Sequence, residues 1–170
     1  MRRFFILLFT ILIFVTFNRA AAEKLPVRLH VRAEDDSDKA QKLKLHVRDG
    51  VLSCAAELVE NVKNEEKAYA VLFQNTGSLR AAARKAAEEK GFDGKISVCV
   101  KREYFPARLY GNTILKEGVY PSVCVEIGDA EGKNWWCVIY PEYCVFEETD
   151  ESTEIRFYSG IRSFFRKLFG

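Results

Sequence analysis

The apolar residues of this chain change their spacing along the sequence, and this change limits the fold more than any other feature. Between residues 40 and 62 they recur every three or four positions, as on a helix with one buried side. From Lys95 onward they alternate, as in Ile96 and Val98, which is the period of a strand. An earlier alternating run, Val27–Ala33, predicts a strand with one buried face. Together these periods predict an α+β two-layer domain with an N-terminal strand, two helices and a mainly antiparallel C-terminal sheet.

The first helix follows an acidic loop. Asp36 or Ser37 is suited to cap its N-terminus, and we expect the helix to run to about Val62. Gly50 lies inside it and should cost ~1 kcal/mol relative to alanine.

The second helix and the sheet are bounded by turn residues. Ser78 is a suitable cap for a helix that ends near Lys90, and residues 68–74 fit either a short helix or a strand. The C-terminal sheet is expected from four segments, at residues 95–101, 109–115, 120–127 and 135–140.

The first 22 residues have the organisation of a secretory signal. Arg2 and Arg3 precede an apolar run of 14 residues, Phe4 to Phe17, interrupted only by threonine. A helix that spans a membrane needs ~20 apolar residues, so this run is too short to be one. Because the small residues Ala20 and Ala22 follow the run, we expect cleavage between Ala22 and Glu23. The alternative is an uncleaved N-terminal anchor that tilts or thins the bilayer locally. The expected organisation is a signal peptide at 1–22, a domain at 23–146, and an acidic linker with an amphipathic C-terminal helix at 147–170.

Charge and motifs exclude several classes of function. Without the three arginines of residues 1–22, the chain has 23 basic and 24 acidic residues, so we expect no nucleic-acid partner. No catalytic or metal-binding motif is present, and His30 and His46 are isolated histidines of a kind typical of surfaces or packing. We therefore expect no catalytic residue, no metal and no cofactor.

The basic and apolar C-terminal helix either docks on the domain, lies on an anionic membrane or contacts a partner.

The five cysteines suggest one disulfide. Cys137 and Cys144 are expected to pair, because strands turning at Pro141 would bring them close enough. Cys99 and Cys124 either pair, if their strands are neighbours, or are packed thiols. Cys54 is expected to be buried in the first helix, and the odd total leaves at least one cysteine unpaired.

Two segments that together span most of residues 27–146 carry unusual combinations of residues. The first contains His30-Val31, Asp36-Ser37, Gln41, Leu43-Lys44 and Val47-Arg48-Asp49. The second contains Tyr104-Phe105-Pro106, Arg108, Tyr110-Gly111, Gly118, Tyr120, Gly132–Val138 (GKNWWCV), Pro141 and Cys144. In these motifs the chain resembles the stage II sporulation protein R family of endospore-forming bacteria.

This resemblance implies a secreted sporulation signal rather than an enzyme. Such a protein is made in the forespore and exported into the space between the two membranes that separate forespore and mother cell. There it is expected to activate a membrane-embedded aspartic protease, the stage II sporulation protein GA, which then processes the sigma-E precursor. A peripheral membrane contact through the C-terminal helix is a further possibility.

Two groups of residues are expected to determine the contact with the protease, either at its surface or as the scaffold behind it. The first group is His30, Asp36, Gln41, Lys44, Arg48 and Asp49, and the second is Tyr104, Phe105, Arg108 and Tyr110. Arg48 and Asp49 could equally be an ion pair within the fold. The alternatives to signalling are a small secreted hydrolase of cell wall or peptide, with Asp36 and Asp49 as acid and base, and a thiol-redox protein using Cys137 and Cys144.

Overall fold

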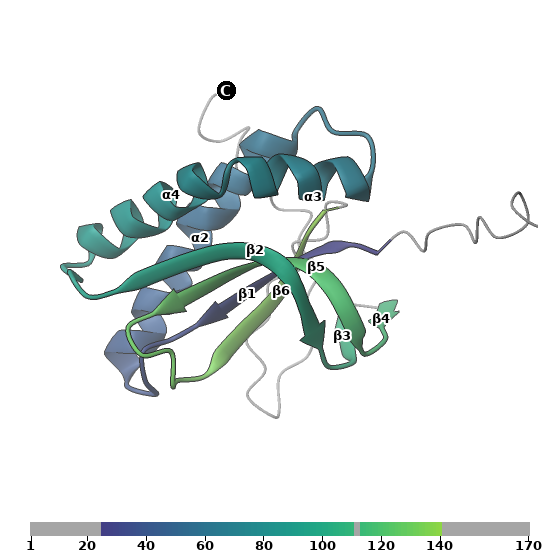
Figure 1. Cartoon of the computed structure of the whole chain (residues 1–170). Coiled ribbons are helices and arrows are strands. Elements are labelled where there is room, and N and C mark those ends of the chain that lie inside the picture. The colour runs from purple at the N-terminus through teal and green to yellow at the C-terminus, as the bar shows by residue number, and fades with distance from the viewer. Residues whose placement is uncertain (1–24, 111–112, 141–170) are drawn as a thin grey trace, which may run out of the picture.

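The computed structural model describes residues 25–110 and 113–140, in which three helices pack on one face of a four-stranded sheet (Figure 1). This is the α+β two-layer architecture expected from the change of apolar period. A two-stranded hairpin lies next to the place where β2 ends and β5 begins. In chain order the elements are β1 (Val27–Arg32), α2 (Asp38–Val59), α3 (Glu65–Gln74), α4 (Thr76–Glu89), β2 (Ile96–Phe105), β3 (Arg108–Tyr110), β4 (Thr113–Leu115), β5 (Gly118–Ile127) and β6 (Asn134–Tyr140).

The N-terminal strand occupies an inner position of the sheet, whose strand order is β2-β5-β1-β6. β1 pairs in parallel with β5 and antiparallel with β6, and β2 pairs antiparallel with β5. The sheet is therefore mainly antiparallel, as predicted, with one parallel pairing. Because β1 has a neighbour on each side, His30 lies opposite Cys124 on β5 and opposite Trp136 on β6.

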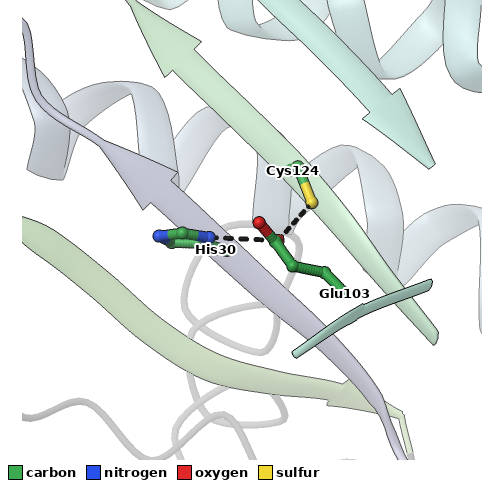
Figure 2. Close-up of side chains that lie close together, drawn as sticks. All are labelled: His30, Glu103 and Cys124. Atoms are coloured by element: carbon green, nitrogen blue, oxygen red, sulfur yellow. Dashed lines mark hydrogen bonds and ion pairs between the residues drawn. The ribbon is translucent and has the colours of Figure 1, made fainter. Parts of the chain in front are cut away.

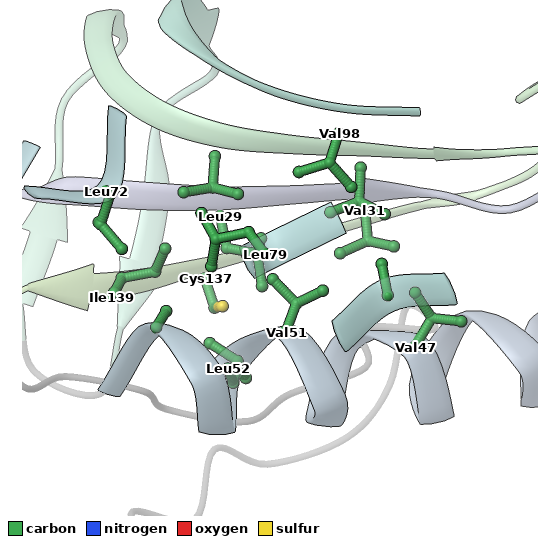
Figure 3. Close-up of a cluster of buried hydrophobic side chains, with 14 of the residues drawn as sticks. Leu29, Val31, Val47, Val51, Leu52, Leu72, Leu79, Val98, Cys137 and Ile139 are labelled. Carbon is green, nitrogen blue, oxygen red and sulfur yellow. The ribbon is translucent and has the colours of Figure 1, made fainter. Parts of the chain in front are cut away.

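The hydrophobic core fills the space between the sheet and the helices. Leu29 and Val31 of β1 point toward Val47 and Val51 of α2, and all four side chains are fully buried (Figure 3). Since burying one such side chain contributes about 1.5–3 kcal/mol, this layer is the main source of stability. The apolar stripe predicted for the first helix is buried from Ala40 to Ala55.

The helix boundaries differ from the predicted ones by a few residues. Ser37 is the N-cap of α2, and its hydroxyl accepts a hydrogen bond from the Ala40 amide at 3.2 Å. α2 ends at Val59 rather than near Val62, and α4 begins at Thr76 rather than after Ser78. Residues 68–74, which fitted a helix or a strand, are helical and belong to α3.

Two predictions about the strands are wrong. Residues 109–115 do not form one strand, because β3 and β4 pair antiparallel as a hairpin, and the turn-favouring Gly111 and Asn112 separate them in the sequence. β1 is not exposed on one face, because Arg28 is 0% and His30 only 2% exposed. An inner strand is flanked on both sides, so its polar face can be enclosed by long side chains from its neighbours.

The cysteine predictions have mixed outcomes. Cys99 and Cys124 lie opposite each other on β2 and β5 and are both free, so the packed-thiol alternative holds. Cys54 lies on α2 and is half-buried rather than buried. Cys144 lies outside the described residues, so its disulfide with Cys137 stays a prediction.

Other predictions also lie outside the described residues. They are the signal peptide at 1–22 with its cleavage at Ala22 and Glu23, and the linker and helix at 147–170. Among the helices that the structure describes, none is long and apolar enough to cross a membrane.

Candidate functional site

Charged, aromatic and sulfur-containing side chains gather on the sheet face that points away from the helices, which we call the distal face. The alternation of β1 places Arg28, His30 and Arg32 on this face, while Leu29 and Val31 enter the core. Side chains of the same face on β2, β5 and β6 surround them. These are Glu103, Phe105, Tyr120, Ser122, Cys124, Asn134 and Trp136.

His30 is held at the centre of the distal face by three contacts. Its ring stacks on that of Trp136, with the ring centroids 3.6 Å apart. Its Nε2 lies 2.8 Å from Asn134 Oδ1, and its Nδ1 lies 3.1 Å from Glu103 Oε2. Burial lowers the pKa of His30, and the contacts with Asn134 and Glu103 reverse this only in part. The imidazole is therefore mainly neutral at pH 7.

Glu103 links His30 to Cys124 (Figure 2). The Cys124 thiol donates a hydrogen bond to Glu103 Oε2 at 2.7 Å, while Oε1 accepts one from Arg32 Nη2 at 3.0 Å. Burial raises the pKa of Glu103, but the hydrogen bonds from Cys124 and His30 outweigh it, and the net shift is downward. Burial, with the hydrogen bond to Glu103, raises the pKa of the Cys124 thiol. The carboxyl group is therefore ionised and the thiol protonated.

This arrangement lacks the properties of a thiol nucleophile. A nucleophilic cysteine needs a thiolate and a base that takes the thiol proton. The Cys124 thiol is instead held protonated by a carboxylate, and His30 contacts that same carboxylate. The three side chains do offer a nitrogen, an oxygen and a sulfur atom that lie within 4.8 Å of one another. Those are donor types that zinc uses in proteins.

Arg28 is a fully buried cation whose hydrogen-bonding capacity is only partly used. Its guanidinium carbon lies 4.0 Å from the ring centroid of Phe105, 4.9 Å from that of Tyr120 and 5.4 Å from that of Tyr110. Nη2 donates to the Tyr110 hydroxyl, but Nε and Nη1 have no hydrogen-bond partner among residues 25–110 and 113–140. Burial lowers the pKa of Arg28, yet a guanidinium remains protonated in proteins. Since each unsatisfied buried donor costs about 1–3 kcal/mol, this site is suited to an external acceptor.

Most of the first predicted group lies away from His30, around α2 and the start of β6, and is bonded within the fold. Asp36 accepts a hydrogen bond from the Lys133 amide at 2.7 Å. The group's other members behave similarly: Lys44 donates to Gln41 Oε1 at 2.6 Å, and Gln41 Nε2 donates to the Asp35 carbonyl at 2.7 Å.

Arg48 and Asp49 form an ion pair at 2.8 Å, in line with the alternative that they act within the fold. The Arg48 guanidinium also lies 4.2 Å from a ring centroid of Trp135. Asp36 and Asp49, the two acids of the hydrolase alternative, thus both have partners within the chain.

The second predicted group divides between scaffold and surface. Phe105 is fully buried beneath Arg28, so it supports the site and is not itself a contact surface. Tyr110 and Arg108 are half-buried on β3. Tyr104 is 56% exposed, and its hydroxyl donates to Glu117 Oε2 at 2.9 Å. The structure therefore brings His30, Phe105 and Tyr110 together, although they come from both predicted groups.

Four exposed apolar side chains lie at the end of the sheet where the β3–β4 hairpin is found, and we call them the apolar end. It consists of two cross-strand pairs, Tyr104 with Val119 and Leu109 with Ile114, and each member is more than half exposed. Because side chains alternate along a strand, Tyr104 and Val119 point to the sheet face opposite Phe105 and Tyr120, which pack on Arg28. Exposed apolar side chains of this kind are typical of protein interaction sites.

Sequence reasoning overlooked Arg28, Glu103 and the role of Cys124. A signal for Arg28 was present, because it shares the period of β1 with His30. No local signal exists for Glu103 and Cys124, because only the pairing of β1 and β2 with β5 brings them to His30.

Comparison with known proteins gives one family and one relative. Residues 23–150 match the family model described as Stage II sporulation protein R. Stage II sporulation protein R of Bacillus subtilis (strain 168) is 34% identical over 121 residues, covering 71% of this chain and 54% of that protein. The chain thus spans about half the length of this curated relative. No solved structure matches it.

Proposed function

We propose, from the premise that this chain belongs to the stage II sporulation protein R family, that it is a sporulation signal which activates a protease by binding it. Its role in sporulation follows from the family. The finer proposal is that it acts between the forespore and mother-cell membranes on the stage II sporulation protein GA. Activation of this protease would start processing of the sigma-E precursor.

The proposed location is supported by the N-terminal sequence. The two arginines, the apolar run and the small residues before Glu23 form an export signal, and the family match begins at residue 23. The match therefore starts where we expect the exported domain to start.

Arg28 is the observation that carries the proposed mode of action. A buried guanidinium with unsatisfied Nε and Nη1 is suited to a carboxylate, which binds arginine with two parallel hydrogen bonds. The hairpin that supplies Tyr110 to this site also carries two residues of the apolar end. Because Arg28 is fully buried, we expect the partner to displace the side chains that cover it and to place an acidic group beside the guanidinium. We also expect it to cover the exposed Leu109 and Ile114 of the hairpin with its own apolar side chains.

Activation requires that the protein bind one state of the protease more tightly than another. Moving a two-state equilibrium from 1:99 to 99:1 needs a ~10⁴-fold difference in affinity, about 5.5 kcal/mol. Burial of apolar area contributes about 25 cal/mol per Å². This difference corresponds to roughly 220 Å² more apolar area buried against one state of the protease than against the other.

The test is to co-express the full chain with the protease and the sigma-E precursor, and to follow precursor cleavage on immunoblots. Serine at Leu109 and Ile114 together should reduce cleavage at least tenfold, since both side chains are exposed and their loss should leave the fold intact.

Phe73→Ser is the matched control, because Phe73 is 59% exposed but lies on α3, on the opposite side of the sheet. It should signal normally. Equal cleavage by the double variant and the wild-type chain would disprove the assigned surface, and absence of cleavage with the wild-type chain would disprove the function.

A further inference from the structure

We propose that His30, Glu103 and Cys124 form a binding site for one zinc ion. This inference goes beyond the signalling function and stands independently of it. Nothing in the sequence suggested a metal, because the three ligands come from β1, β2 and β5 and meet only in the folded sheet (Figure 2).

The donor atoms are already close to the arrangement that zinc requires. His30 Nδ1 lies 3.1 Å and Cys124 Sγ 2.7 Å from Glu103 Oε2, and all three atoms lie within 4.8 Å of one another. With zinc bonds of ~2.0–2.3 Å in a tetrahedron, ligand atoms are roughly 3.3–3.6 Å apart. The two short contacts therefore need to open by less than about 1 Å, and His30 Nδ1 and Cys124 Sγ, which lie within 4.8 Å of each other, need to come to roughly 3.6 Å. Changes of side-chain torsion in the three ligands can supply these shifts.

A second residue contacts each of the three ligands and leaves a lone pair of the ligand atom available to the zinc ion. His30 Nε2 is bonded to Asn134 Oδ1 at 2.8 Å, and Glu103 Oε1 accepts from Arg32 Nη2 at 3.0 Å. Cys124 Sγ lies 3.2 Å from the Ser122 hydroxyl. Protein metal sites use such outer contacts to fix the orientation of their ligands.

The hydrogen-bond partners of His30 are compatible with a metal ion at Nδ1. A neutral imidazole has one N–H, yet the two ring nitrogen atoms of His30 both face oxygen acceptors, Asn134 Oδ1 and Glu103 Oε2. When Nδ1 carries the hydrogen, it donates to Glu103, and Nε2 accepts from Arg32 Nε at 3.4 Å while its lone pair also faces Asn134 Oδ1. A cation bound at Nδ1 moves the hydrogen to Nε2, which then donates to Asn134 Oδ1, 2.8 Å away.

The donor types select the metal. A sulfur ligand favours zinc over calcium or magnesium, which prefer oxygen. On binding, the Cys124 thiol releases its proton to solvent, and the thiolate and the carboxylate together balance the charge of the ion. Three protein ligands leave the fourth position to water.

The experiment uses the full chain without an affinity tag, stripped of metal by a chelator and titrated with Zn²⁺ against a chromophoric competitor. Wild-type protein should bind one equivalent. Cys124→Ser and Glu103→Gln should weaken binding at least 100-fold, and Asn134→Ala should weaken it by about 10–100-fold. Cys54→Ser is the matched control, because Cys54 lies on α2, and it should bind like the wild type.

The proposal is overturned when the wild type binds no zinc, or when Cys124→Ser binds it equally well. X-ray absorption of the zinc-loaded wild-type chain keeps the test independent of how the variants fold. The expected shell is one sulfur and three lighter atoms, and a shell without sulfur contradicts the proposal.

Discussion

Replacing Arg28 by methionine should separate recognition from stability. In the wild type, each of the three aromatic rings stabilises the desolvated guanidinium by about 2 kcal/mol, and its hydrogen bond to Tyr110 contributes about 1.5–3 kcal/mol. Against this, Nε and Nη1 each cost about 1–3 kcal/mol as unsatisfied buried donors, and desolvation of the charge itself costs several kcal/mol more. These contributions nearly cancel. We therefore expect Arg28→Met to change the free energy of unfolding by less than about 2 kcal/mol, while cleavage of the sigma-E precursor falls at least tenfold.

Denaturant unfolding followed by circular dichroism measures the first quantity, and the co-expression assay measures the second. Arg84→Met is the control, because Arg84 is an arginine with a buried part that lies on the helical side of the sheet, where it donates to the Gly94 carbonyl at 2.7 Å. It should signal normally. A loss of more than about 3 kcal/mol in Arg28→Met would mean that Arg28 is a paired structural charge. Normal cleavage by this variant would refute its role in recognition.

Three further predictions concern stability. The free energy of unfolding should fall as pH drops below about 6.5, because burial lowers the pKa of His30 in the folded protein. The unfolded chain then binds the proton more readily than the folded one. His30→Gln should make the free energy of unfolding less dependent on pH between pH 7 and 5. Gly50→Ala should fail to raise the melting temperature, since its Cβ would lie 3.0 Å from that of Ala86, whereas Gly77→Ala, with nothing within 4 Å, should raise it by a few degrees. Ser37→Ala should lower the free energy of unfolding by about 1 kcal/mol in denaturant titrations, and an unchanged midpoint would contradict its capping role.

Gly50 illustrates where reasoning from the sequence stops. Helix propensity alone predicts that alanine is better at this position by ~1 kcal/mol. In the structure, Gly50 lies where α2 approaches α4 closely, with Ala86 opposite, so packing between the two helices opposes the propensity. Propensity is a property of one residue and its neighbours in the chain, whereas this contact depends on how two helices pack.

The distal face shows the same limit for the candidate site. The alternation of β1 correctly placed Leu29 and Val31 in the core and His30 on the opposite face. It did not show that this opposite face is buried, nor that Glu103 meets His30. Both follow from the inner position of β1 and from the pairing of β2 with β5.

The sequence by itself determined the fold class, the main helices and strands, and the family of this protein. Apolar periods, caps and turn residues act over a few positions, so they specify the two-layer class, the buried stripe of α2 and the Ser37 cap. Only the tertiary structure decided which side chains share a site. Strand order and register are set by packing between segments far apart in the chain, and a shift of one residue would turn His30 away from Glu103 and Cys124.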